Sequence, residues 1–256
     1  MSILEMVIRD PYYIKNIENP SEELQLIAVN KNGITLKFIK MPSLEVQWKA
    51  LENNVWAIEY IEKPTEEMCI FVVKAAWNTL KFLKHPTKDV LEKAVSSKGW
   101  ALQFIKEPSL EIQKIAVEKD WDSIKYIVDP LEEIQLLAVN SYYGALKYIK
   151  EPTLKVKRTA IVQKAEAINF LEEITEEEMM LFIEDNIDII KYAANRVDIE
   201  TVETVLMEKL ANEEIESDYV IKFADCEALL IDKVHFIYKY GSSASKRIFV
   251  DYKLSY

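Results

Sequence analysis

The 256-residue sequence predicts an all-α protein, an α-solenoid of 22-residue helix–turn–helix repeats with a degenerate helical cap at its C-terminal end. Three observations predict this fold. Seven of the eight prolines recur every 22 residues, apolar residues follow each of them at helical spacing, and no segment of the array alternates polar and apolar residues as a strand would. The prolines that set the period are Pro20, Pro42, Pro64, Pro86, Pro108, Pro130 and Pro152.

Each repeat is expected to begin with a helix of about ten residues. Proline ends the preceding helix, and in six of the seven copies it is followed by a Ser or Thr, whose hydroxyl can accept from the free amides of the new helix. An acidic residue in the first turn favours the helix dipole. Apolar residues four, eight and nine positions after the proline, such as Leu24, Ala28 and Val29, then form one buried stripe.

The second helix of each repeat is expected to be short, about two turns, and to end in a pattern such as Leu-Lys-Phe-Ile at residues 36–39. Gly33, Gly99 and Gly144 lie between the two helices, where a left-handed glycine would end the first one. A row of glutamines five residues after the proline is expected to bond the backbone of the neighbouring repeat, and the alternative is a shared ligand-binding row. Its members are Gln25, Gln47, Gln113 and Gln135.

The repeat fades toward both ends, as the caps of a solenoid do. We therefore expect a repeat array over residues 1–195, with a worn copy at each end, and a helical cap or interaction region over residues 196–256. The cap is expected to contain a helix over residues 198–212 and one or two helices over residues 218–240. Residues 245–256 fit either a short helix or an extended arm.

The repeat has three recurring parts: a Pro-Ser/Thr-x-Glu-aliphatic-Gln start, an Ala-Val pair and a Leu-Lys-Tyr/Phe-Ile end, over roughly residues 1–193. This pattern resembles the short two-helix repeat arrays of unassigned function in bacteria and their phages, which are similar to HEAT and tetratricopeptide solenoids. The 22-residue repeat is shorter than in those two families, so no site residue is carried over. The resemblance implies binding rather than catalysis, and a phage-encoded inhibitor that sequesters a host defence protein is one setting.

The sequence offers little material for catalysis. His85 precedes a proline in a turn, His235 is expected to be packed in an apolar run, and Cys69 and Cys226 are expected to be buried free thiols. Because no catalytic or metal-ligand spacing is present, we expect no enzyme, metal or cofactor. The first residues do not form a secretion signal and no stretch of 18 apolar residues occurs, so we expect a cytoplasmic protein with no membrane partner.

Aromatic residues that depart from the repeat pattern are the first candidates for protein binding, because Trp and Tyr are enriched at binding hot spots. Most of them cluster 12 to 14 residues after the proline, in the expected turn between the two helices. The alternative is that they simply cover the neighbouring repeat. The candidates are Trp48, Trp56, Trp77, Trp100, Trp121, Tyr142 and Tyr143.

The net charge of −11 is unevenly distributed. Residues 174–232 carry 4 basic and 17 acidic side chains, whereas residues 233–256 carry 5 basic and 1 acidic. The acidic block predicts a protein partner with a basic patch, or else only solvates the cap helices. A homo-oligomer through the C-terminal region is a further option. The candidate acids are Glu176, Glu177, Glu178, Glu184, Asp185 and Asp188.

A lysine stripe supports an alternative function, a solenoid that binds nucleic acid. Positions 17 and 20 after the proline are expected one turn apart on the second helix and hold eight lysines against three glutamates. Such a stripe can neutralise phosphates, or it can complement the helix dipole and keep the surface solvated. The lysines are Lys37, Lys40, Lys81, Lys84, Lys106, Lys125, Lys147 and Lys150.

Overall fold

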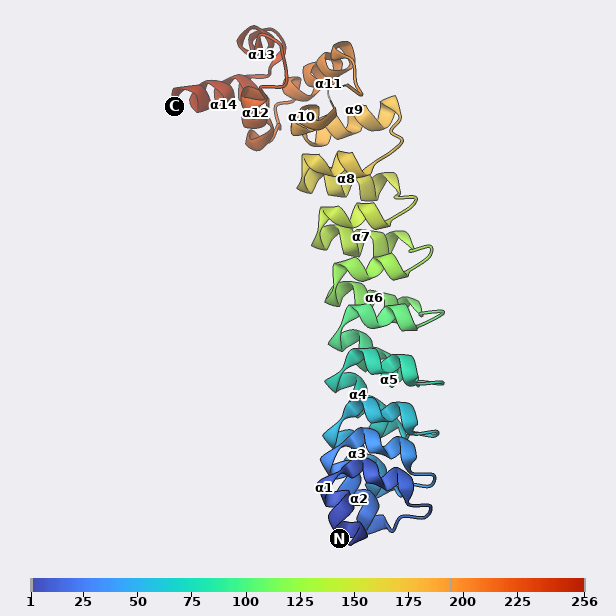
Figure 1. Ribbon diagram of the computed structural model, residues 1–256. Helices are drawn as coiled ribbons and strands as arrows, with labels where there is room; N and C mark the ends of the chain where they lie inside the picture. Colours follow the sequence, from blue (N-terminus) through green and yellow to red (C-terminus); the bar gives the residue numbers. More distant parts are fainter. Residues whose placement is uncertain (1, 194, 256) are drawn as a thin grey trace. The chain divides into compact units, whose positions relative to one another are not determined.

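The computed structural model describes residues 2–193 and 195–255, and every regular element within these ranges is a helix. The chain is an all-α repeat solenoid, as the proline period predicts. It forms two compact units, Met1–Ile127 and Val128–Tyr256, called unit 1 and unit 2 below. Within unit 1 the helices follow one another along the stack in chain order (Figure 1). None of the helices in the described ranges combines the length and apolar character needed to cross a membrane.

Unit 1 consists of helix pairs in which an α-helix is followed by a 3₁₀ helix. The α-helices are α1 (Ile3–Arg9), α2 (Glu22–Lys31), α3 (Leu44–Asn53), α4 (Glu66–Ala75), α5 (Lys88–Ser97) and α6 (Leu110–Lys119). The 3₁₀ helices are η1 (Pro11–Asn16), η2 (Gly33–Phe38), η3 (Val55–Tyr60), η4 (Trp77–Phe82), η5 (Gly99–Phe104) and η6 (Trp121–Tyr126). The ten-residue first helix and the two-turn second helix are confirmed, and the 3₁₀ geometry of the second is a finding of the structure.

Unit 2 continues the pairs and then departs from them. The paired helices are α7 (Glu132–Ser141) with η7 (Tyr143–Tyr148), α8 (Leu154–Gln163) with η8 (Ala165–Phe170), and α9 (Glu176–Asp185) with η9 (Ile187–Ile189). The remaining helices are α10 (Ile190–Ala193), α11 (Ile199–Ala211), α12 (Ser217–Asp225), α13 (Lys233–Tyr240) and α14 (Ser243–Leu254). The helices expected over residues 198–212 and 218–240 are confirmed, and the undecided tail is helical.

One extended residue joins the two helices of a repeat. Asn54 has φ −154° and ψ 108°, and its backbone N–H donates to the carbonyl of Ala50, closing α3. Its side-chain oxygen accepts from the backbone N–H of Trp56 at 3.0 Å, which caps η3. A single asparagine therefore ends one helix and begins the next, with no loop between them.

The prediction of left-handed glycines is wrong, because no glycine in the described ranges has a positive φ. Gly33 and Gly99 are instead the first residues of η2 and η5, where the next repeat comes very close. A Cβ on Gly33 would lie 2.3 Å from the backbone oxygen of Ala50, and a Cβ on Gly99 would lie 2.2 Å from that of Ala116. Glycine is needed there for close backbone approach. At Gly144 the nearest atoms belong to the ring of Tyr142.

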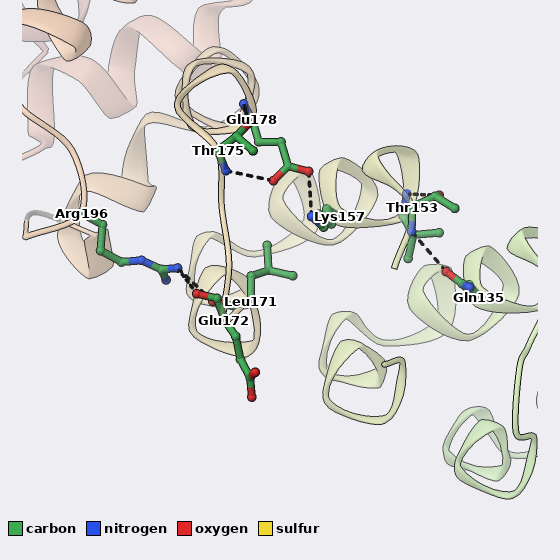
Figure 2. A network of polar contacts seen from close by, with 9 residues as sticks. Gln135, Thr153, Lys157, Leu171, Glu172, Thr175, Glu178 and Arg196 are labelled. Atoms are coloured by element: carbon green, nitrogen blue, oxygen red, sulfur yellow. Dashed lines mark hydrogen bonds and ion pairs between the residues drawn. The ribbon is translucent and has the colours of Figure 1, made fainter. Parts of the chain in front are cut away.

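The glutamine row serves mainly its own repeat, so the expectation that it bonds the neighbouring backbone holds only for Gln135. The amide nitrogen of Gln47 donates to the carbonyl of Pro42 at 3.0 Å, which ties the proline turn to the helix that follows it. Gln135 in addition accepts a longer bond of 3.4 Å from the backbone N–H of Thr153, in the next repeat (Figure 2). The same bond to the repeat's own proline is made by Gln25, Gln113 and Gln135.

The core of each repeat is the stripe that the sequence predicts, together with two positions of the 3₁₀ helix. In the second repeat Val46, Ala50 and Leu51 of α3 are buried, as are Ala57 and Ile58 of η3. These apolar side chains pack one repeat against the next and supply the main stabilising contribution of the stack.

The C-terminal helices have a core of their own. Phe223 of α12 lies 6.1 Å from Phe236 of α13 and 6.2 Å from Phe249 of α14, measured between ring centroids. All three rings are buried. This aromatic cluster holds α12, α13 and α14 together. The buried residues of α14 are Ser245 and Phe249, which are four positions apart and so share one side of the helix.

Candidate binding surfaces

The two histidines and the two cysteines lie in different environments. His85 is exposed in a loop, and His235 is exposed on α13, so the expectation that His235 is packed is wrong. Its backbone N–H, at the start of the helix, donates to Asp232. Cys69 and Cys226 are buried free thiols as expected, and burial raises the pKa of both, which keeps them protonated. In the described ranges no three His, Cys, Asp or Glu side chains gather as metal ligands.

The predicted aromatic residues are half-buried at the start of the 3₁₀ helices rather than in a turn. Trp77, Trp121 and Tyr143 are the first residues of η4, η6 and η7, while Trp56 and Trp100 are the second residues of η3 and η5. Trp48 lies apart from them, half-buried in α3, and the exposed Tyr142 caps η7.

Most of these rings pack on an aromatic residue of the following repeat. The centroid of Trp56 lies 5.9 Å from that of Phe82 in an edge-on arrangement, and Trp77 stacks on Phe104 at 6.0 Å. On the α-helices, Trp48 meets Phe71 edge-on at 5.7 Å. Such pairs are worth about 0.5–1.5 kcal/mol beyond the burial of their area. The rings therefore join successive repeats and keep part of their surface accessible.

Lysines of the 3₁₀ helices lie over the same rings. The Nζ of Lys81 is 5.1 Å from the ring centroid of Trp56 and 4.8 Å from that of Phe82, so one ammonium contacts rings of two repeats. Such contacts are cation–π interactions. The aromatic–lysine row, as we name this surface of unit 1, consists of Tyr12, Lys37, Phe38, Trp56, Lys81, Phe82, Trp100, Lys125 and Tyr126.

The lysines of this row differ in their partners. Lys37 and Lys81 are exposed and form no ion pair with any residue in the described ranges. Lys125 pairs with Asp122 at 2.8 Å, and the indole of Trp100 donates to the same carboxylate at 2.7 Å. Burial by itself would raise the pKa of Asp122, but these two donors outweigh burial and hold it below its usual range.

The other lysines of the predicted stripe lie outside the row. Four of them follow the 3₁₀ helices and lie in the exposed loops between repeats, namely Lys40, Lys84, Lys106 and Lys150. The expectation that positions 17 and 20 after the proline lie one turn apart on the second helix is therefore wrong. The reason is that the 3₁₀ helix ends two residues earlier. Lys147 lies on η7 in unit 2, exposed, with its Nζ 4.7 Å from the ring centroid of Tyr148.

The candidate acids of α9 and η9 divide into two groups. Glu176 and Glu177 are exposed, whereas the other four carboxylates form ion pairs within unit 2. These pairs are Glu178 with Lys157 at 2.7 Å, Glu184 with Lys209 at 3.9 Å, Asp185 with Arg158 at 2.7 Å, and Asp188 with Lys191 at 2.8 Å. In Figure 2 the carboxylate of Glu178 also reaches back to the backbone of Thr175, which completes a capping box. Much of this charge therefore holds the helices in place.

An open groove of about 440 Å³ lies between α9 and α11, and we call it the acidic groove. The carboxylates of Glu177, Glu184 and Glu208 rim it, and Met180, Leu181 and Val205 provide apolar surface. Lys209 and Asn212 complete the lining. The pKa of Glu177 is lowered because its carboxylate accepts from its own backbone N–H and from the hydroxyl of Thr175, so this side chain keeps its negative charge in mild acid.

The acids of α9 could be predicted from the sequence, but the residues that line the other side of the groove could not. Glu208 and Val205 lie on α11, beyond the end of the period, and only the helical packing of α11 on α9 brings them to the site. The high density of acids over residues 174–232 was the available signal, and it did not specify which carboxylates would meet.

Comparisons of the chain with protein families, curated proteins and solved structures find no match. Its function therefore has to rest on the geometry and charge of the aromatic–lysine row and the acidic groove.

Proposed function

We propose that this protein is a non-catalytic protein-binding solenoid whose acidic groove takes a basic segment of a partner protein. One observation carries the proposal, namely that three carboxylates surround an apolar surface in an open groove. An arginine or lysine of the partner would meet Glu177 or Glu208, while an adjacent apolar side chain would cover Met180 and Leu181.

The charge around the groove supports the same partner. Glu177 and Glu208 are both exposed and have no ion pair in the described ranges, so their charges are available to a ligand. The net charge of −13 over residues 174–232 would attract a basic protein and raise its association rate. A phage-encoded inhibitor that sequesters a host defence protein in the cytoplasm is the setting that the repeat resemblance implies.

The first test is capture from a bacterial lysate by the immobilised full-length chain, followed by a carbodiimide, which joins a carboxylate to an amine in direct contact. We expect one stoichiometric partner, cross-linked through its lysines to Glu177, Glu184 or Glu208. The double variant Glu177→Lys with Glu208→Lys replaces two attracting charges by two repelling ones. It should therefore weaken capture by about tenfold or more.

The matched control is Glu200→Lys with Glu227→Lys. It makes the same change in net charge, and Glu200 is the second residue of α11 as Glu177 is the second residue of α9, so the effect on a helix dipole is also matched. Both control residues are exposed and lie outside the groove. Equal loss in the two variants, cross-links elsewhere, or no partner at all would contradict the proposal.

The aromatic–lysine row supports a second candidate function, binding of single-stranded nucleic acid by unit 1. The ammonium groups of Lys37 and Lys81, which have no ion pair in the described ranges, lie together with accessible ring surface on this row, and proteins bind single strands through this combination of charge and stacking. The rings of Trp56 and Phe82 and the ammonium of Lys81 are one such group.

A mobility-shift titration with single-stranded DNA and RNA at low salt tests this second function. We expect binding whose affinity falls steeply with salt. The double variant Lys37→Glu with Lys81→Glu should lower the affinity for the single strand by about tenfold or more. Lys74→Glu with Lys119→Glu is the control, since these exposed lysines lie in the last turns of α4 and α6, off the row. A flat titration of the unaltered chain would eliminate this candidate.

A further inference from the structure

The last two helices of unit 2 expose an unusual amount of apolar surface. Val234 and Tyr238 on α13, one turn apart, are 67% and 76% exposed, and Leu254 on α14 is 81% exposed. Large apolar side chains this open to water are normal singly but mark an interaction surface when they are contiguous.

These side chains form one strip. Lys246, Val250 and Leu254 follow at intervals of four residues and so share one side of α14. The Nζ of Lys246 lies 5.7 Å from the ring centroid of Tyr238, which connects that side of α14 to α13. We call the surface the C-terminal strip; it consists of Val234, Tyr238, Lys246, Arg247, Val250 and Leu254.

The C-terminal strip carries basic side chains, whereas the acidic groove carries carboxylates. Lys246 and Arg247 flank its apolar residues, and residues 233–256 as a whole carry a net charge of +4. The acidic groove has the complementary composition, with carboxylates at its rim and Met180, Leu181 and Val205 between them. Both surfaces belong to unit 2, yet the strip does not cover its own groove, because its apolar side chains are exposed. Figure 1 shows α14 pointing away from α9.

We infer that the C-terminal strip of one copy docks into the acidic groove of a second copy, so that the chain self-associates through unit 2. Each copy carries one strip and one groove, so two copies can exchange both contacts around a two-fold axis. The inference rests on the proposed function in one respect, that the groove accepts basic, apolar segments. It adds that a second copy occupies the groove until a partner displaces it.

A charge-swap experiment on the full chain tests the docking, with molar mass measured by light scattering after size exclusion at low ionic strength. The unaltered chain should have the mass of two copies at high concentration. The strip variant, Lys246→Glu with Arg247→Glu, and the groove variant, Glu177→Lys with Glu208→Lys, should each raise the dissociation constant by about tenfold or more.

Mixing the two variants is the decisive step. In the mixed pair the acidic strip of one copy meets the basic groove of the other, and the unaltered strip of the second meets the unaltered groove of the first. Both contacts are then attractive, so the mixture should form dimers at a concentration at which each variant alone is mostly monomeric. Circular dichroism should confirm that both variants remain helical, and Glu200→Lys with Glu227→Lys should dimerise like the unaltered chain.

The outcomes separate this inference from the proposed function. A monomeric chain whose groove variant loses a captured lysate partner overturns the docking and leaves the proposed function standing. Dimers restored by the charge swap, with no lysate partner recovered, support the docking and count against the proposed function. A monomeric chain that sediments with phosphatidylserine vesicles, and stops doing so in the strip variant, would overturn the docking by assigning the strip to a lipid surface.

Discussion

Phe182→Ala is expected to lower the free energy of unfolding of unit 2 by about 3–5 kcal/mol, although alanine is the usual residue at this place in the repeat. Phe182 stands eight residues into the last repeat, where Ala28, Ala50 and Ala160 stand in earlier ones. It is fully buried in α9, which packs against α8 of the preceding repeat and also against α11, which is not a repeat helix. Truncation would remove the apolar contacts and leave a cavity, and the consensus residue is too small for this interface.

Hydrogen exchange over α9 and α11 is the measurement for Phe182→Ala, because all five tryptophans lie in unit 1 and their fluorescence does not follow unit 2 directly. Protection of both helices should fall, whereas protection of α2 and α3 serves as an internal reference. Phe71→Ala is the comparison, because Phe71 is 37% exposed in α4 and should lose much less stability in unit 1. Unchanged protection in Phe182→Ala would show that the α9–α11 contact does not depend on this ring.

Gly99→Ala is expected to lower the stability of unit 1 by about 1–3 kcal/mol. The new Cβ would meet the backbone oxygen of Ala116 at 2.2 Å, so η5 and α6 must move apart. Two effects compete, because the φ of Gly99 is not positive and alanine would gain about 0.4–1 kcal/mol by restricting the unfolded chain. The steric term is larger because the obstacle is backbone, which cannot rotate away.

Tryptophan fluorescence during urea unfolding checks this prediction, since Trp100 is the next residue and reports on η5 directly. The control is Gly144→Ala, where the added Cβ would meet the ring of Tyr142 at 2.3 Å; because Gly144 lies in unit 2, its stability is followed by hydrogen exchange over η7. That ring is on an exposed side chain and can turn aside, so the loss there should be smaller. A Gly99→Ala protein as stable as the original would refute the close approach of the two backbones.

Much of the fold could be predicted from the sequence because its information is periodic. Proline, the capping hydroxyl and the apolar stripe each act within one repeat, and the same combination recurs in six of the seven copies. Ser43 illustrates this: its hydroxyl accepts from the backbone of Val46, as the pattern predicts. Leu131 breaks the pattern, and α7 accordingly begins without a side-chain cap. Local rules of this kind need no knowledge of the neighbouring repeat.

What the sequence did not reveal depends on contacts between repeats. The sequence pattern predicts separate surfaces for the lysines and the aromatic residues, whereas the three-residue turn of the 3₁₀ helix and the offset between repeats bring Lys81 onto Trp56. The pattern predicts a conformational role for the glycines, whereas Gly33 and Gly99 permit a close backbone approach that only packing defines. The acidic groove and the C-terminal strip lie beyond the period, where a single sequence offers no recurring pattern to align.

The single residue that joins the two helices of a repeat has a consequence for how this chain tolerates change. Asn54 bonds to both helices at once, so an inserted residue there would break both caps. The loops between repeats are different: Met41, in the first of them, is 89% exposed. Proteases and engineered insertions should therefore enter at those loops, and fragments should differ in length by multiples of 22 residues. The repeat would then be the unit by which the chain is cut, lengthened or shortened.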